Sequence, residues 1–300
     1  MNPRSTIAAE LIALLEGAAA AAPLPRVRAL HLPRPETLDT RRGEFCALEL
    51  EDGTLGLAFV LLGDTWARLG AREVHAGLVG ADTLQLARGY AHDNALERTL
   101  GMAAINAASR CVFDRIGYVA PASADSIGEL DPRAGDHVGM VGLFGPLLGR
   151  CTAAGARVTV IELREDLVGE HDGYRVTLDA AELAACNKVL CTSSVLLNGT
   201  ADSILGHCAG AAHLAMIGPG AGCLPDPLFG RGVTLFGGSW ITDARAVVEA
   251  LRAGESWSAH ARKYAIRRDE YAGLAGLAAA AGVALPPDHT PADHTPRDRA

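Results

Sequence analysis

The sequence predicts an α/β protein in which a smaller α+β domain precedes a doubly wound parallel sheet. From residue 137 onward, strand-like segments alternate with helix-like ones, which implies parallel strands joined by right-handed crossovers. Between residues 188 and 243, short apolar runs end abruptly in Gly, Ser, Thr, Asn or Pro, a pattern typical of buried parallel strands. The chain of 300 residues is long enough for two domains that each bury a core, and its composition, 49% hydrophobic with 34 glycines, suits an α/β protein.

The first domain is expected over residues 1–112. An amphipathic helix over 5–17 places Ile7, Leu11 and Leu14 on one side. Three strands are then predicted before two helices, and this order favours an α+β arrangement. The strands are expected at 26–32, 44–52 and 54–63, and the helices at 81–91 and 94–110.

The second domain is expected over residues 113–284, after a segment rich in Pro, Asp and Gly that places the boundary between about 110 and 135. Its pattern predicts a Rossmann-like fold with a five-stranded parallel sheet. The segment 256–283 is predicted to be helical. Residues 285–300 contain a repeated Asp-His-Thr-Pro and are expected to form a disordered tail.

Charge and cysteine usage exclude several classes of protein. The net charge of −8 argues against a nucleic-acid partner, which usually meets a basic patch. Glu10 and Glu16 interrupt the apolar N-terminal segment, so we expect neither a signal peptide nor a membrane span. Seven cysteines form no even framework and no Cys-x-x-Cys pair, which favours reduced thiols. A cytoplasmic protein is therefore predicted.

A first candidate ligand loop runs from Gly142 through Phe144 and Gly145 to Pro146. Pro146 fits the first position of a helix, where backbone N–H groups are free to hold an anion. Glu162 stands 20 residues after Gly142, at the end of the next strand, where nucleotide and S-adenosylmethionine sites place an acid on the ribose. The alternative is a tight turn beside a solvated glutamate.

Further polar residues follow the next two strands. Thr192 and Ser193 end one strand, and Asn198 and Thr200 precede the following helix. One of the latter pair can cap that helix, and the rest are candidates for ligand contact. Gly218-Pro219 follows the next strand, where the glycine permits either close approach of a ligand or a plain turn.

Metal-binding and nucleophile signals are weak. His207, Cys208, His213 and Cys223 lack the spacing of a zinc site, and Cys191 ends a buried strand, which favours a packing role. No Gly-x-Ser-x-Gly, His-Glu-x-x-His or phosphate-loop motif occurs. We therefore predict no metal site of the protein's own, and expect any metal to arrive with a small chelator or on weak oxygen ligands.

Six runs of the sequence resemble the family described as putative heavy-metal chelation, whose members join an enolase N-terminal-like domain to a Rossmann-like domain. The resemblance extends over about residues 5–255. One departure is Cys-Thr-Ser-Ser at 191–194, where the family more often has a Thr-Gly-Thr-like turn. The runs are LGMAAINAAS (100–109), GDHVGMVGLFGPLL (135–148), VTVIELRED (158–166), CTSSVLLNGTADSIL (191–205), MIGPGAGCLPDPLF (216–229) and GVTLFGGSWITD (232–243).

The resemblance implies a cleft between the domains, in which Asn106 approaches Glu162, Asn198, Thr200 and the Gly218-Pro219 loop. It also implies a small-molecule binding protein concerned with metals or metallophores. The alternatives are an enzyme that binds a nucleotide or S-adenosylmethionine for group transfer, and a subunit whose crevice is vestigial. No catalytic residue is assigned, and a homo-oligomer remains open.

Overall fold

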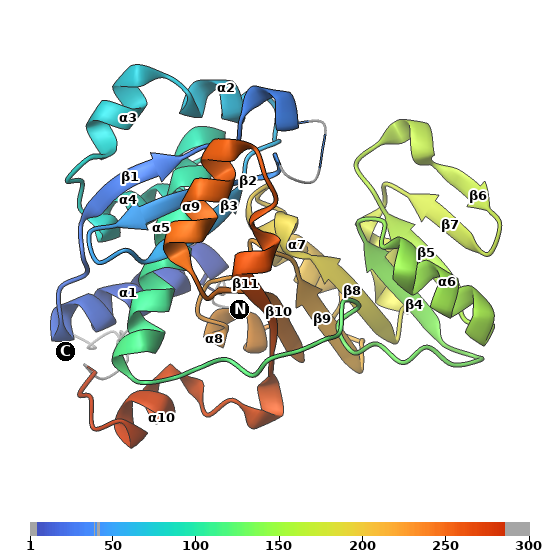
Figure 1. The fold of residues 1–300 in the computed structure, drawn as a ribbon. Helices are drawn as coiled ribbons and strands as arrows, with labels where there is room; N and C mark the ends of the chain where they lie inside the picture. The colour runs from blue at the N-terminus through green and yellow to red at the C-terminus, as the bar shows by residue number, and fades with distance from the viewer. Residues whose placement is uncertain (1–4, 39, 41–42, 286–300) are drawn as a thin grey trace, which may run out of the picture.

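The computed structural model describes residues 5–38, 40 and 43–285. Its framework is two β-sheets, one small and antiparallel and one large and mostly parallel (Figure 1). The small sheet has the order β1-β2-β3 and is formed by Val27–His31, Phe45–Leu50 and Leu55–Phe59. These three strands lie where the sequence predicts them. No described helix combines the length and hydrophobicity that a membrane crossing requires.

Helices cover one face of the small sheet. The longest, α5 (Ala95–Arg115), begins at Asn94, whose side chain accepts hydrogen bonds from the first turn. The N-terminal helix α1 (Ile7–Ala21) is capped by Thr6 and packs against α5, and its Leu11 and Leu15 are buried in the main core. Two further helices, α2 (Thr65–Leu69) and α3 (Arg72–Leu78), were not predicted, whereas α4 (Thr83–Arg88) was.

The large sheet has eight strands in the order β11-β10-β9-β8-β4-β5-β7-β6. The α/β fold class is therefore confirmed, but the predicted five parallel strands are too few, because β10, β9, β8, β4, β5 and β7 all pair in parallel. These six strands are Leu235–Ile241, His213–Ile217, Lys188–Thr192, His137–Val141, Arg157–Ile161 and Tyr174–Thr177.

The two edge strands are antiparallel, and neither was predicted. β11 (Ala261–Arg267) pairs with β10 along its full length, so the helix expected over 256–283 is wrong in this part. Tyr264 and Ile266 bury alternate positions against the main core, and that pairing outweighs the helical propensity of Arg, Lys and Ala. The other edge is β6 (Gly169–His171). A helix, α10 (Gly273–Ala280), does follow β11.

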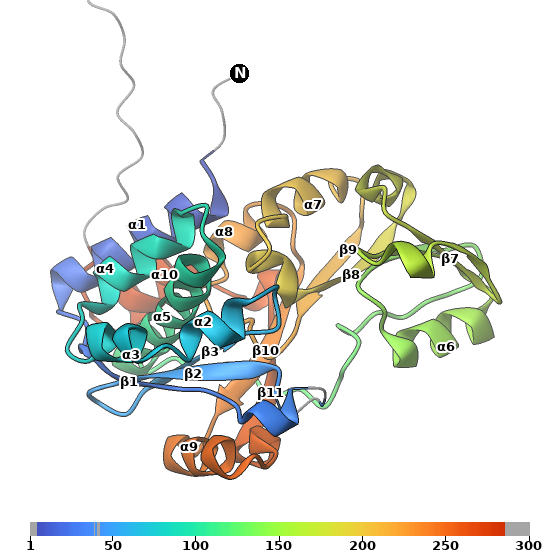
Figure 2. The ribbon, with the colours of Figure 1, turned by 90° about the horizontal axis from the view of Figure 1, so that it is seen from above.

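Four helices of the second half of the chain follow strands of the large sheet. α6 (Gly145–Ala154), α7 (Ala201–His207) and α8 (Asp226–Phe229) follow β4, β8 and β9. α9 (Ala244–Ala253) covers the face of the small sheet that α5 leaves open, and Figure 2 shows the sheet between them. Its Val247 and Leu251 belong to one buried cluster with Leu57 of the small sheet and Ile241 of β10, so the two sheets share a core cluster.

An ion-pair cluster fastens α1 to the second half of the chain. Arg231 Nη1 lies 2.9 Å from Glu10 Oε2, and Arg231 Nε lies 2.9 Å from Asp202 Oδ1. Asp202 also accepts a hydrogen bond from the backbone N–H of Ile7. The side chain of Arg231 is only 11% exposed, so this cluster is better shielded from water than an ordinary surface pair.

Candidate functional site

The carboxyl ends of β4 and β8 meet at a point where the chain reverses direction across the sheet. β4 lies between β5 and β8: the chain passes from β4 to β5 on one side and later adds β8 on the other side. Such a switch point is where open α/β sheets form a ligand crevice. Gly142 and Thr192 face each other there: a Cβ on Gly142 would lie 3.3 Å from Thr192 Cγ2, and the φ of +84° favours glycine.

Glu162 binds the loop that follows β4. Its carboxylate accepts a hydrogen bond of 3.0 Å from the N–H of Leu143 and one of 3.3 Å from the N–H of Leu163. The N–H of Phe144 points at Met140 Sδ, 3.2 Å away, and Pro146 has no N–H. The loop therefore offers fewer free donors to an anion than the sequence led us to expect. The carboxylate of Glu162 retains lone pairs for a hydroxyl donor.

The loops after β8 and β9 touch one another. Gly218 has a φ of +152°, and a Cβ there would lie 2.2 Å from the Oγ of Ser193. Ser193 is buried, and Gly218 donates its N–H to the carbonyl of Gly237 on β10. Only glycine permits this approach, so Gly218 has a definite steric role and Pro219 follows it into the crevice.

Asn198 and Thr200 form a local turn of their own. Asn198 Oδ1 accepts from both the N–H and the hydroxyl of Thr200, at 3.1 and 2.6 Å. Thr200 occupies the cap position of α7 but makes no side-chain cap bond, contrary to one of our two expectations. Neither residue lines the two cavities described below. Their contribution to ligand contact remains a prediction.

Asn106 lies between the two sheets, beside the loop that contains Pro219, and no contact among the described residues joins it to Glu162, Asn198 or Thr200. It is 4% exposed, and its Nδ2 donates to the carbonyls of Leu57 on β3 and Gly220 after β9, at 2.7 and 2.9 Å. Its Oδ1 is buried and has no hydrogen-bond partner among the described residues. Because Nδ2 serves two carbonyls, the orientation of this amide is determined.

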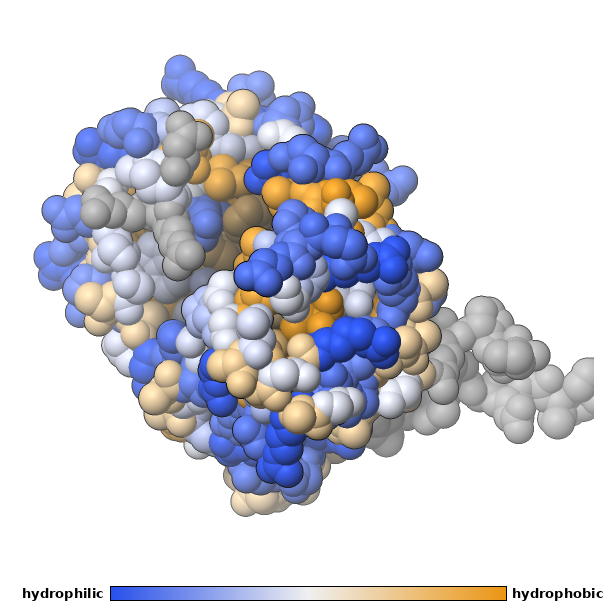
Figure 3. All heavy atoms as spheres, turned by 90° about the vertical axis from the view of Figure 1, so that its right-hand side faces the viewer, coloured by the Kyte–Doolittle hydropathy of each residue, from blue (hydrophilic) through white to orange (hydrophobic). Residues whose placement is uncertain are grey.

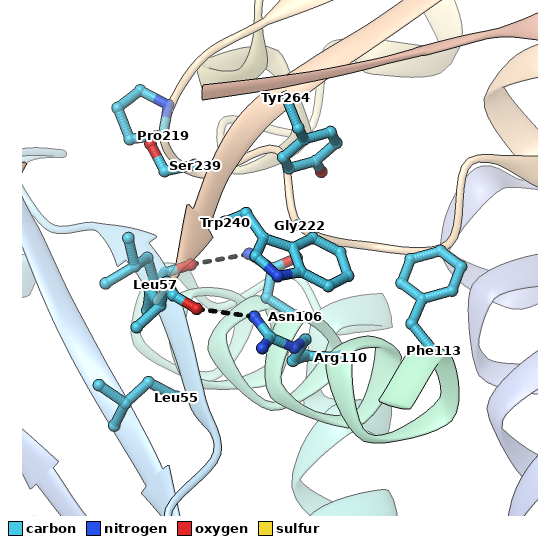
Figure 4. A pocket seen from close by; sticks show the side chains of 11 residues that line it. Leu55, Leu57, Asn106, Arg110, Phe113, Pro219, Gly222, Ser239, Trp240 and Tyr264 are labelled. Carbon is cyan, nitrogen blue, oxygen red and sulfur yellow. Dashed lines mark hydrogen bonds between the residues drawn. The ribbon is translucent and has the colours of Figure 1, made fainter. Parts of the chain in front are cut away.

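Asn106 borders a cavity of about 40 Å³, which is room for a few water molecules (Figure 4). Arg110, one turn further along α5, stacks on Trp240 with its Cζ 4.1 Å from the ring centroid. The cavity is lined by Leu55, Leu57, Asn106, Arg110, Phe113, Pro219, Gly222, Ser239, Trp240, Ile241 and Tyr264. It is too small for a metabolite, so it is best described as a hydrated gap beside the crevice.

A larger pocket of about 230 Å³ shares Pro219, Ser239 and Tyr264 with this gap. Phe144, Gly218 and Pro219 of the predicted site residues line it. Its other walls, which the sequence did not predict, come from the end of β9, from β10 and β11, and from the segment before β4. Those further residues are Ser123, Asp125, Ser126, Gly128, Glu129, Ile217, Leu235, Gly237, Gly238, Ser239, Lys263, Tyr264 and Ala265.

The segment 123–129 forms a rigid wall of this pocket. Asp125 Oδ2 accepts hydrogen bonds of 2.8 Å from the N–H groups of Ile127 and Glu129. Gly128 packs closely against the large sheet: a Cβ atom added to Gly128 would lie 2.4 Å from the Cβ of Ala215. Glu129 has a φ of +54°, unique among non-glycine residues of the described chain, and pairs with Arg267. Such strain in a pocket wall is often associated with function.

The cysteines are placed for packing. All seven are buried, and in the described chain no group of three or more His, Cys, Asp or Glu side chains could hold a metal ion. Burial raises the pKa of Cys46 and of Cys223 to about 12, and that of Cys191 well above its usual value. Metal ligation by cysteine requires the thiolate, and these positions disfavour it.

Three exposed apolar side chains follow strand ends at this edge of the large sheet. Leu143, Leu163 and Leu178 follow β4, β5 and β7 and are 48%, 73% and 46% exposed. Figure 3 views this end of the molecule and shows a hollow with hydrophobic atoms on its floor. A ligand at the switch point would therefore meet both polar groups and apolar surface.

Two family models match the chain, over residues 38–109 and 125–268, and both carry the description putative heavy-metal chelation. The chain belongs to this family. The resemblance noted from the sequence is thereby confirmed. No curated protein matches the chain.

Two solved structures of the chelation family, both of unknown function, are similar in fold. A protein from Desulfitobacterium hafniense has a TM-score of 0.60 at 18% identity, over 85% of this chain and 98% of its own. One from Pyrococcus horikoshii has a TM-score of 0.59 at 22% identity, over 86% of this chain and 99% of its own. At these identities the likeness concerns the fold.

Proposed function

We propose that this protein binds a small metal-chelating molecule in the 230 Å³ pocket beside the carboxyl ends of the parallel strands. The observation that carries the proposal is the convergence of Phe144, Gly218 and Pro219 on one pocket large enough for an organic ligand. The family description supports a connection with metals. Because the described side chains supply no metal-binding cluster, the donor atoms would come from the ligand.

An enzyme that binds a nucleotide or S-adenosylmethionine is the second candidate. Glu162 favours it, because a carboxylate at a strand end can accept from ribose hydroxyls. The hydrogen bonds from Leu143 and Leu163 to the same carboxylate count against it. We therefore favour the binding protein.

The proposal is tested by filling the pocket. Ala265 is 5% exposed and lines the pocket, so Ala265→Leu places three further carbons in the space without opening the core. Native mass spectrometry of the purified wild type should show a copurified small molecule, and the variant should lack it. Ala184→Leu, at an exposed residue outside the pocket, is the matched control. A ligand retained in full by Ala265→Leu would contradict the proposal.

A further inference from the structure

The shape of the large pocket follows from three cross-strand pairs on one face of β10 and β11. The pairs are Leu235 with Arg267, Gly237 with Ala265, and Ser239 with Lys263. The two outer pairs carry full side chains, whereas the middle pair carries only a hydrogen and a methyl group. A hollow therefore opens at the middle pair, and backbone forms part of its floor.

Apolar side chains surround this hollow. Phe144, Ile217, Pro219 and Leu235 line it, and the methyl group of Ala265 lies on its floor. A ligand that displaces water from these surfaces gains free energy in proportion to the apolar area it covers. The pocket therefore favours a ligand with a compact, apolar body.

The charged side chains that line the pocket differ in whether they already have a partner within the protein. Glu129 is held by Arg267, whose Nε lies 2.7 Å from its Oε2. The carboxylate of Asp125 accepts from two backbone N–H groups of its own loop. The ammonium of Lys263, by contrast, forms no ion pair within the described chain, and the neighbouring hydroxyl of Ser239 forms no hydrogen bond there. Lys263 and Ser239 thus offer a cation and a hydroxyl donor side by side, while the hydroxyls of Ser123 and Ser126 and Oδ1 of Asp125 also line the pocket.

We propose that the pocket takes a small organic acid, with its apolar body over Gly237 and Ala265 and its carboxylate against Lys263 and Ser239. This inference rests on the proposed function and names the ligand class for the same pocket. A carboxylate is also a metal ligand, so an acid of this type can carry a metal through an oxygen that Lys263 leaves free.

Three probes with one ring and different charges test the class: picolinate, picolinamide and 2-picolylamine. Calorimetric titration of the full chain should show the tightest binding for picolinate. Picolinamide should bind about fivefold more weakly, the scale of a partly exposed ion pair. Lys263→Met should remove this preference, and Lys263→Arg, which keeps the charge, should retain it. Circular dichroism verifies that each variant is folded.

The outcomes distinguish a wrong ligand class from a wrong binding pocket. If Ala265→Leu weakens all probes but Lys263→Met leaves the preference for picolinate intact, the pocket stands and the acid class fails. If picolinate binding is unchanged in Ala265→Leu, the proposed function itself fails. Tighter binding of 2-picolylamine, or no binding of any probe to the wild type, would also overturn the inference.

Discussion

Single residues in this fold carry contacts between parts of the chain that are far apart. Asn106 joins β3 to the loop after β9 through two hydrogen bonds, and Glu162 joins the end of β5 to the loop after β4. Glu162 was predicted as a site residue from its place at a strand end, whereas Asn106 was expected there only from the family resemblance. The sequence did not reveal their partners, because backbone groups distant in the chain supply them.

Replacing Asn106 should destabilise the protein. Asn106→Ala removes both donors and leaves two buried carbonyls without their partners, so the free energy of unfolding should fall by about 2–4 kcal/mol. Urea denaturation measures this from the midpoint and slope. Asn198→Ala, in a more accessible turn, is the control and should cost roughly 1 kcal/mol or less. Equal losses in the two variants would show that Asn106 does not join the two halves.

Replacing Glu162 should loosen the loop that carries Phe144. In Glu162→Ala the N–H of Leu143 loses its acceptor, so its amide hydrogen should exchange about tenfold faster. Glu162→Gln keeps an acceptor oxygen and should stay close to the wild type. Nuclear magnetic resonance hydrogen exchange at Leu143 distinguishes the variants. Identical exchange in all three proteins would argue that the carboxylate does not hold this loop.

Between elements, β4 and β8 are tied by a polar group at their amino ends. Asp136 accepts from Lys188 Nζ at 2.7 Å and from Asn187 Nδ2 at 2.8 Å, and Asn187 Oδ1 in turn accepts from the N–H of His137. These hydrogen bonds lower the pKa of Asp136 to about 2. The switch point therefore lies at the carboxyl ends of β4 and β8, and the hydrogen bonds of Asp136 and Asn187 hold the amino ends of the same two strands together.

This group predicts a loss of stability in acid. Because the pKa of Asp136 is lower in the folded state than in the unfolded chain, where it is about 3.9, the stabilisation is complete above that value. It is lost as the pH falls through about 2. Urea midpoints of the wild type should decline between pH 4 and 2, and those of Asp136→Asn should decline less. Parallel declines in the two proteins would show that other carboxylates dominate.

The sequence predicted the interior strands better than the edge strands. β8 and β9 are continuous apolar runs, because a parallel strand is buried on both faces. β11 is a mixed segment of Arg, Lys, Ala and Tyr, whose identity as a strand depends on pairing with β10. The pocket was missed for the same reason: it arises where Gly237 meets Ala265 across two strands, and no local pattern marks that pairing.

At the scale of the whole molecule, the buried cysteines set an expectation for metal content. Protein purified without a histidine tag and dialysed against a chelator should hold well under one equivalent of transition metal by elemental analysis. Its thiols should react with Ellman's reagent at pH 8 only after unfolding, because burial raises their pKa and blocks access. Stoichiometric metal that is lost in Cys191→Ser, Cys208→Ser or Cys223→Ser would contradict this.

At the same scale, the two halves of the chain each build one of the two sheets. The two sheets occupy the two halves of the chain as expected, with the predicted crossing between α5 and β4. The boundaries at 112 and 284 remain predictions, because α9 packs on the first sheet and α1 contacts α8. Of the expected tail, residues 286–300 lie outside the described chain.

The cluster around Arg231 sets an order of events during synthesis. α1 packs on α4 and α5, which leave the ribosome early, but Glu10 has to wait for Arg231, 221 residues later. At about 5–20 residues per second, that interval lasts roughly 10–45 s. In that interval α1 can pack on α4 and α5, while the carboxylate of Glu10 and the N–H of Ile7 remain hydrogen-bonded to water. The nascent first half therefore exposes polar groups of α1 that find their protein partners only after Asp202 and Arg231 have been synthesised.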